Sequence, residues 1–179
     1  IQLLGRTEAE ISAELSRRLL AEGHHSVNFA IVAAGEHAAS PHHDPGARMV
    51  GVGDGVLCDF GGTMADEFGV GYCSDITRCV WIGEPPVQAA DAYEVLRAAQ
   101  QAAVDAAAPG VAAAAVDAAA RDMIAAAGFG ECFVHRTGHG IGAEEHEDPY
   151  VVADNFDPLV TGNVFSIEPG IYVPGSFGF

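Results

Sequence analysis

The 179-residue sequence predicts an α+β fold with an antiparallel sheet. Two observations lead to this prediction. Apolar, β-branched segments follow one another between residues 27 and 83 without intervening helices, and two alanine-rich helical segments come next, before short strand-like segments return. Strands and helices that are grouped in this way indicate α+β rather than alternating α/β organisation. The length suits one domain, and the composition does not shift abruptly, so we expect a single domain over residues 1–179.

The first expected element is a helix that ends near Glu22. Thr7 is the expected N-cap, and Glu10, three residues later, completes a capping box. One face of this helix is apolar, because apolar residues repeat every four positions at Ile11, Leu15 and Leu19.

Three strands and their connections are expected next. Residues 27–35 (VNFAIVAAG) read as a strand, and residues 39–46 (ASPHHDPG) as a loop because of their prolines and glycine. Residues 55–62 (GVLCDFGG) read as a buried strand that ends in a Gly-Gly turn. A hairpin-like connection over residues 63–72 leads to a further strand over residues 75–83.

Two helices and two short strands complete the prediction. We expect helices over residues 87–108 and 111–127, separated by Pro109-Gly110, with Gly128 as the C-cap. Two strands are expected within residues 163–173, on either side of a Pro-Gly turn.

Charge and composition exclude several classes of partner. Eight basic and 25 acidic residues give a formal net charge of −17, which repels phosphate backbones, so we expect no nucleic acid. The longest alanine-rich run, residues 109–120, is too short to span a bilayer, so we expect no membrane insertion. No secretory signal pattern is visible in the opening IQLLGRTEAE, and the four cysteines form no C-x-x-C motif. We therefore expect reduced thiols and a cytoplasmic protein.

Four residues stand out as candidate metal ligands. Asp59 ends an apolar strand and Asp75 begins the next, so both carboxylates are expected at the same end of a sheet, where they need a cation between them. His139 has a glycine on each side, which lets the backbone approach another group closely. Glu168 closes the apolar segment NVFSI. The alternatives are turn residues, salt bridges or, around His139, a polar surface loop.

These residue types together favour a metal hydrolase. Two aspartates, one glutamate and one histidine form an oxygen-rich set that suits Mn²⁺, Co²⁺, Fe²⁺ or Zn²⁺. An excess of carboxylates also suits a pair of ions about 3.5–4 Å apart.

Three motifs in order resemble those of a known family. DFGG…GYCSDITR, HRTGHGIGAEEHE and NVFSIEPGIY are similar to the metal motifs of the metallopeptidase family M24, which includes Xaa-Pro aminopeptidase, prolidase and methionine aminopeptidase. GRTEAEI and AAGEHAASPHH also resemble the opening of its catalytic domain. The resemblance implies the pita-bread fold, a curved antiparallel sheet covered by helices. PHH and HRTGHGIG lean toward the proline-directed branch.

The resemblance also implies residue roles. The metal ligands would be Asp59, Asp75, His139 and Glu168, holding two divalent ions, Mn²⁺ or Co²⁺ before Zn²⁺ or Fe²⁺. Asp75 would bridge the ions, and Glu168 would also transfer the proton of the attacking water. His42, His135 and His146 match family histidines that contact the substrate.

The chain departs from the family pattern in three places. Asp59 and Asp75 are 16 positions apart, and ADEFGV (65–70) looks like extra loop. The family expects a fifth ligand, a glutamate, shortly after a stretch like GIYVPGSFGF, but the chain stops at Phe179. The N-terminal domain of the proline-directed members is also absent, so we expect an incomplete catalytic domain.

The expected function is hydrolysis of Xaa-Pro peptide bonds by a metal-activated water, acting on proline-containing peptides. The fragment alone is expected to show little activity. Dimers are common in the family, so a homodimer is the assembly to test. The alternatives are a non-catalytic pita-bread module that binds a peptide or protein, a methionine aminopeptidase-like enzyme, or a creatinase-like hydrolase that uses histidine in place of metal.

Overall fold

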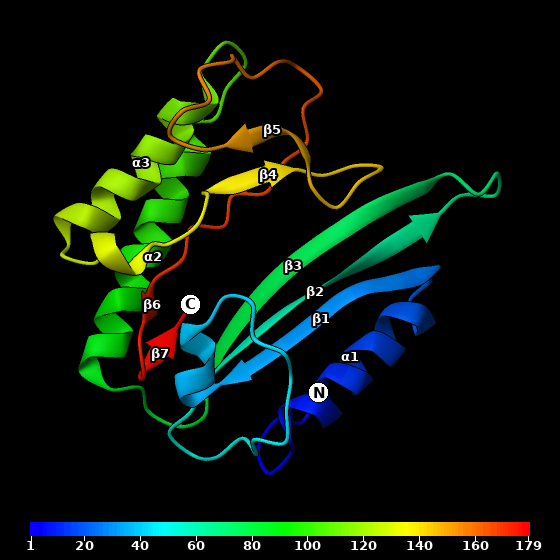
Figure 1. Ribbon diagram of the computed structural model, residues 1–179, viewed down its shortest axis with the longest axis vertical. Coiled ribbons are helices and arrows are strands. Elements are labelled where there is room, and N and C mark those ends of the chain that lie inside the picture. The colour runs from blue at the N-terminus through cyan, green and yellow to red at the C-terminus, as the bar shows by residue number, and fades with distance from the viewer. The chain divides into compact units, whose positions relative to one another are not determined.

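The computed structural model describes residues 1–179, which divide into two compact units (Figure 1). Unit 1 comprises Ile1–Pro86 and Tyr172–Phe179, and unit 2 comprises Val87–Ile171. The single catalytic domain expected over residues 1–179 stays a prediction.

Unit 1 begins with the predicted helix α1 (Glu8–Ala21). The capping box at its start is confirmed: Glu10 N donates to Thr7 Oγ1 at 3.2 Å, and Thr7 N donates to Glu10 Oε2 at 2.9 Å. Ile11 and Leu15 are buried, as their spacing predicted. The helix therefore forms where local sequence signals agree with a buried apolar face.

The sheet of unit 1 is antiparallel, in the order β1 (Ser26–Ala34), β2 (Gly55–Ala65) and β3 (Gly71–Trp81). β2 and β3 curve together as a long hairpin, and α1 runs along β1 (Figure 1). The face under α1 carries a buried apolar cluster: Ile11, Leu15, Val32, Ala34, Val50, Val56 and Cys58. A short 3-10 helix, η1 (Gly35–Ala39), follows β1, and β6 (Tyr172–Val173) pairs with β7 (Phe177–Gly178).

The Gly-Gly turn and the long connection predicted after Asp59 are wrong. β2 continues through Gly61 and Gly62 to Ala65, and β3 begins at Gly71, so only residues 66–70 form the connection. The glycines serve close packing instead of a turn. A Cβ on Gly61 would lie 2.0 Å from the carbonyl oxygen of Ser74, and one on Gly62 would lie 2.3 Å from that of Ser26.

Unit 2 contains the two predicted alanine-rich helices, α2 (Val87–Ala106) and α3 (Ala113–Ala126), which pack against each other. The C-cap of α3 is Ala127, one residue before the predicted Gly128. Gly128 follows it with φ +87°. A 3-10 turn, η2 (Gly130–Cys132), precedes the antiparallel pair β4 (Gly138–Gly140) and β5 (Glu147–Val151). The helices supply the packed base of the unit and β4 carries His139.

Only one of the two strands predicted within residues 163–173 forms, namely β6. The segment before it is extended beside β4 and forms one isolated bridge, between Gly140 and Phe165, with Ile141 N donating to Val164 O at 3.1 Å. Ser166 N donates to His139 O at 2.8 Å and Glu168 N donates to Thr137 O at 2.7 Å. In return, His139 N donates to the hydroxyl of Ser166 at 3.0 Å, so a side chain replaces part of the backbone ladder.

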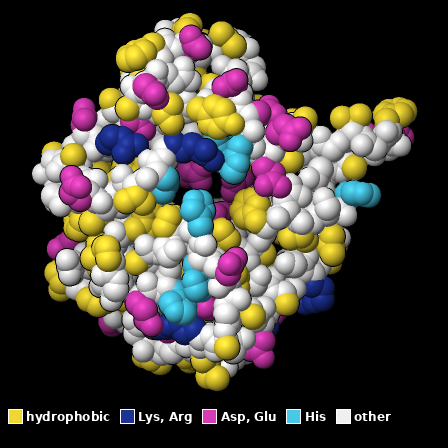
Figure 2. Space-filling model, viewed as in Figure 1, with side chains coloured by type: hydrophobic (Ala, Val, Ile, Leu, Met, Phe, Trp, Pro, Cys, Tyr) yellow, Lys and Arg dark blue, Asp and Glu magenta, His cyan; other side chains and the backbone are white.

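The surface reflects the acidic composition. On the face shown in Figure 2, acidic side chains are spread widely while lysine and arginine are few, in line with 25 acidic and 8 basic residues. None of the helices combines the length and apolar character that crossing a membrane would require.

Replacement of Gly61 by alanine tests the close approach in the sheet. Because the added Cβ would meet backbone at 2.0 Å, Gly61→Ala should lower the free energy of unfolding by about 3 kcal/mol, the upper range for overpacking. Gly51→Ala is the control, since its Cβ would meet only Asp54 Oδ2 at an ordinary 3.6 Å. Denaturant titration of both variants measures the difference. Equal stability of the two would contradict the assignment.

Candidate metal centre

Asp59 and Asp75 lie on one face of the unit 1 sheet. Asp59 pairs with Thr77, and Asp75 pairs with Gly61, so the two aspartates are diagonal neighbours on adjacent strands. Side chains alternate along a strand, which places both carboxylates on the face opposite Cys58 and α1. Diagonal positions are about 7–8 Å apart between backbones, within reach of one bound ion or pair of ions.

The aspartates lie inside the strands and not at their ends, so this part of the prediction is wrong. Both are partly buried. Thr77 Oγ1 donates to Asp59 Oδ1 at 2.9 Å and orients that carboxylate. Gly61, directly across from Asp75, has no side chain, and the carbonyl oxygen of Ser74 and the ring of Phe29 lie within 3 Å of where its Cβ would be. Their proximity as a pair was predicted from the neighbouring strands, and the register supplies the geometry.

The nearby cysteines are buried among apolar groups. Burial raises the pKa of Cys58 to about 11, and the negative charge of Asp59 adds to this. Burial likewise raises the pKa of Cys79 to about 12. Without a bound cation, both are therefore thiols at neutral pH. The donors proposed on this face are the carboxylate oxygens of Asp59 and Asp75.

His139 occupies the middle of β4 and is only 2% exposed. Its Nδ1 lies 3.0 Å from the carbonyl oxygen of Gly140, which can only accept a hydrogen bond. Its Nε2 lies 3.0 Å from Glu168 Oε1. When Nδ1 carries the ring proton, Nε2 presents a lone pair to a carboxylate oxygen, so either a second proton or a cation must lie between them. A backbone carbonyl bound to the other ring nitrogen is the usual arrangement of a metal-ligating histidine.

Glu168 is the partner of His139 and not of an arginine. Burial opposes ionisation of Glu168, but hydrogen bonds from His139 and Ser166 and the charges of His139 and His135 outweigh it, so its pKa lies below the ordinary value. Ser166 Oγ lies 2.8 Å from Glu168 Oε1 and also accepts the N–H of His139. The hydroxyl of Ser166 thus forms hydrogen bonds with both residues.

The other predicted histidines take separate positions. The ring of His146 meets that of His139 edge to face, with 4.2 Å between centroids. His135 Nδ1 lies 2.6 Å from the carbonyl oxygen of Arg136, and its ring packs edge-on against Phe133. His42 is exposed in the loop after η1 in unit 1. Asp59 and Asp75 belong to unit 1, while His139 and Glu168 belong to unit 2, so the ligand roles of these four residues stay predictions.

One supporting group was missed from the sequence. Asp117, in the middle of α3 and fully buried, accepts hydrogen bonds from Arg121 at 2.8 and 2.9 Å and from Thr137 Oγ1 at 2.7 Å. Arg121 also donates to the carbonyl oxygen of His135 at 2.9 Å. This network anchors the segment that leads into β4. The signal was available: Asp117 and Arg121 are four residues apart in an otherwise alanine-rich helix.

The fold and the donor residues together define the class, a pita-bread α+β protein with the ligand types of a metallopeptidase. The chain belongs to the metallopeptidase family M24, whose family model matches residues 2–179. The resemblance inferred from the motifs is thereby confirmed, as is the fold class.

Three similar proteins illustrate the relationship. A probable dipeptidase PepE of Mycobacterium bovis is 53% identical over 174 residues, covering 97% of this chain and 45% of the relative. An Xaa-Pro dipeptidase of Lactobacillus delbrueckii subsp. lactis is 46% identical over 176 residues, covering 97% and 46%. The crystal structure of a prolidase from Thermococcus sibiricus matches with a TM-score of 0.94 and 42% identity, covering 100% and 48%. The chain thus spans about half the length of the relatives it matches.

Removal of the Asp117 charge tests the anchoring network. Asp117→Asn should lower the free energy of unfolding by about 3 kcal/mol, because it breaks a buried ion pair and leaves Arg121 without its carboxylate. Asp122→Asn, at an exposed position of the same helix, is the control and should change it by less than about 0.5 kcal/mol. Denaturant titration measures both.

The same pair of variants tests a pH dependence. Burial opposes ionisation of Asp117, but its hydrogen bonds from Arg121 and Thr137 and the charge of Arg121 outweigh this and lower its pKa. A carboxylate with a lowered folded-state pKa stabilises the fold above its unfolded pKa, and this stabilisation is lost as pH falls through the folded value. Between neutral and acidic pH, Asp117→Asn should therefore lose less stability than the unmodified chain. Parallel curves would contradict the assignment.

Proposed function

We propose that this chain carries the catalytic centre of a metal-dependent peptidase that hydrolyses Xaa-Pro bonds. The observation that carries the proposal is His139, whose two ring nitrogens face a carbonyl oxygen and a carboxylate oxygen inside a buried strand. Membership of the M24 family, whose enzymes use a dinuclear site of divalent metal, supports the interpretation of His139 as a metal ligand.

The proposed ligands are Asp59, Asp75, His139 and Glu168. They offer carboxylate oxygens and one imidazole nitrogen, a donor set that fits Mn²⁺ or Co²⁺ first, and Zn²⁺ or Fe²⁺ second. Thr77 and Ser166 hold two of the carboxylates in place through hydrogen bonds. Two bound cations would make hydroxide from a shared water available near neutral pH.

The remaining steps fall to side chains of this chain. Glu168 is ionised, and as a base it would take the proton of the attacking water and pass it to the leaving nitrogen, which in an Xaa-Pro peptide is the proline imine nitrogen. His146, or in second place His135, would hydrogen-bond the oxygen on which negative charge develops. His42 would contact the substrate from its exposed loop.

The proposal extends to setting and assembly. The names of the similar dipeptidases support a short, proline-containing peptide as substrate. We propose that the protein acts in the cytoplasm as a homodimer, a state that light scattering of the purified protein would reveal directly.

Chelation tests the metal requirement. The protein should lose hydrolysis of an Xaa-Pro dipeptide after dialysis against a chelator, and Mn²⁺ or Co²⁺ should restore it, because the water cannot be activated otherwise. An Xaa-Ala dipeptide serves as the specificity control and should be cleaved more slowly. Hydrolysis at equal rates with and without metal would favour a creatinase-like enzyme. Absence of both hydrolysis and metal binding under all conditions would favour a non-catalytic binding module.

Ligand variants test the residues. Asp75→Asn and His139→Ala should each lower kcat/KM at least about 100-fold and reduce bound metal. Loss of a group that only orients a metal ligand already lowers metal affinity or activity by up to about 100-fold, and loss of a ligand should lower them further. Asp122→Asn is exposed on α3 and should retain full activity. His146→Ala should lower kcat while metal content stays constant. Normal metal content and activity in Asp75→Asn would remove Asp75 from the site.

A further inference from the structure

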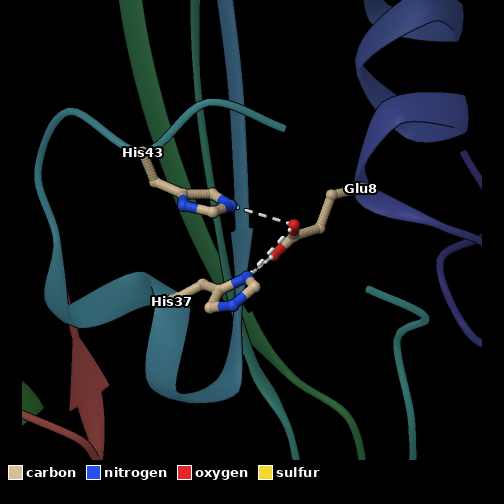
Figure 3. A group of neighbouring side chains, drawn as sticks. All are labelled: Glu8, His37 and His43. Carbon is tan, nitrogen blue, oxygen red and sulfur yellow. Dashed lines mark hydrogen bonds and ion pairs between the residues drawn. The ribbon is translucent and has the colours of Figure 1, made fainter. Parts of the chain in front are cut away.

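A second group of potential ligands lies in unit 1, around the buried carboxylate of Glu8. Glu8 is the first residue of α1 and is 0% exposed. His37 Nδ1 lies 3.0 Å from its Oε1, and His43 Nε2 lies 2.9 Å from its Oε2. Figure 3 shows both imidazole rings directed at the one carboxylate from η1 and from the loop that follows. The three ligand atoms lie within 4.8 Å of one another.

The carboxylate is held by the backbone independently of the histidines. Ala34 N donates to Oε1 at 2.8 Å and Gly46 N donates to Oε2 at 3.2 Å. Burial opposes ionisation of Glu8, but the hydrogen bonds from His43, Ala34, Gly46 and His37 outweigh it and lower its pKa. The site therefore presents an oriented, ionised carboxylate, with each oxygen already turned toward a ring nitrogen.

The histidines are accessible enough to exchange a proton for a cation. The side chain of His37 is 37% exposed and that of His43 is 19% exposed, so solvent reaches the site. Their rings pack at 4.3 Å between centroids, inclined by 36°. A ring that gives up the proton on its inward nitrogen can carry it on the other nitrogen instead.

We propose that Glu8, His37 and His43 form a second divalent-cation site, selective for a zinc-like ion and distinct from the peptidase ligands. Two histidines and one carboxylate are a three-ligand set that Zn²⁺ accepts, with water in the fourth position. Zinc–nitrogen and zinc–oxygen bonds of about 2.0–2.2 Å put neighbouring ligand atoms about 3.3 Å apart in a tetrahedron. The nitrogen–oxygen separations of 2.9–3.0 Å would open by a few tenths of an ångström, and the three ligand atoms, which lie within 4.8 Å of one another, would close onto the one ion.

The competing interpretation is a closed hydrogen-bond cluster in which both histidines simply donate to Glu8. That cluster satisfies the carboxylate without a cation, and it predicts no specific metal uptake. The overall charge of −17 favours the cation, and so does the convergence of ligands from three segments, residues 8, 37 and 43, on one point. The two interpretations differ in metal stoichiometry.

Zinc titration in a background without His139 separates the two sites. The metal-free His139→Ala protein should bind one equivalent of Zn²⁺ in a calorimetric titration. Adding His43→Ala should weaken this binding at least about 100-fold, since it removes a ligand. Adding His25→Ala, at an exposed histidine outside the cluster, should leave it unchanged. Failure of His139→Ala to bind zinc, or unchanged zinc binding after His43→Ala, would overturn the proposal.

Nitrogen NMR of the unmodified protein supplies a second measurement that does not depend on a variant folding. With ¹⁵N-labelled histidine, one added equivalent of Zn²⁺ beyond the peptidase site should shift the resonances of His37 Nδ1 and His43 Nε2, leaving those of His25 in place. Unshifted His37 and His43 resonances at zinc saturation would overturn the proposal. Neither readout uses peptide hydrolysis, so the outcome is independent of the proposed peptidase activity.

Discussion

A carboxylate that leaves water must meet a compensating charge or a set of hydrogen-bond donors, and this constraint organises the whole chain. With 25 acidic and only 8 basic residues, arginine cannot serve every buried acid. Asp117 takes Arg121, while Glu168 faces His139 and Glu8 faces His37 and His43. Histidine thus replaces arginine where the protein could exchange a proton for a metal ion.

Close packing between strands at glycine positions determines where the proposed ligands lie. Gly61 sits across from Asp75, and a Cβ there would lie 2.0 Å from the carbonyl oxygen of Ser74 and 2.7 Å from the ring of Phe29, so glycine is what lets these groups pack this closely beside the carboxylate. Gly138 likewise allows close packing beside His139, because a Cβ there would lie 1.9 Å from the carbonyl oxygen of Ser166. The glycines in the motifs therefore bring strands together around the proposed ligands.

Local signals predicted the elements well, and tertiary packing explains the failures. Thr7 and Glu10 formed the expected capping box because its contacts span three residues. Gly61-Gly62 looked like a turn, since glycine's role in close packing depends on strands distant in sequence. His139 and Glu168 were predicted as ligand types, but their contact depends on a non-local register. The Glu8 group has no local sequence signal, because its histidine partners lie 29 and 35 positions away.

The two histidine–carboxylate groups differ in what they require. At His139, the carbonyl oxygen of Gly140 occupies one ring nitrogen, so the other faces Glu168 with a lone pair unless a proton or cation intervenes. At Glu8, each histidine can donate its own proton, and two backbone N–H groups already bind the carboxylate. Either a second proton or a cation must therefore lie between His139 and Glu168, whereas at Glu8 a cation is only accommodated. The first arrangement suits a resident catalytic metal, and the second suits an exchangeable ion that closes the loop of His43 onto α1.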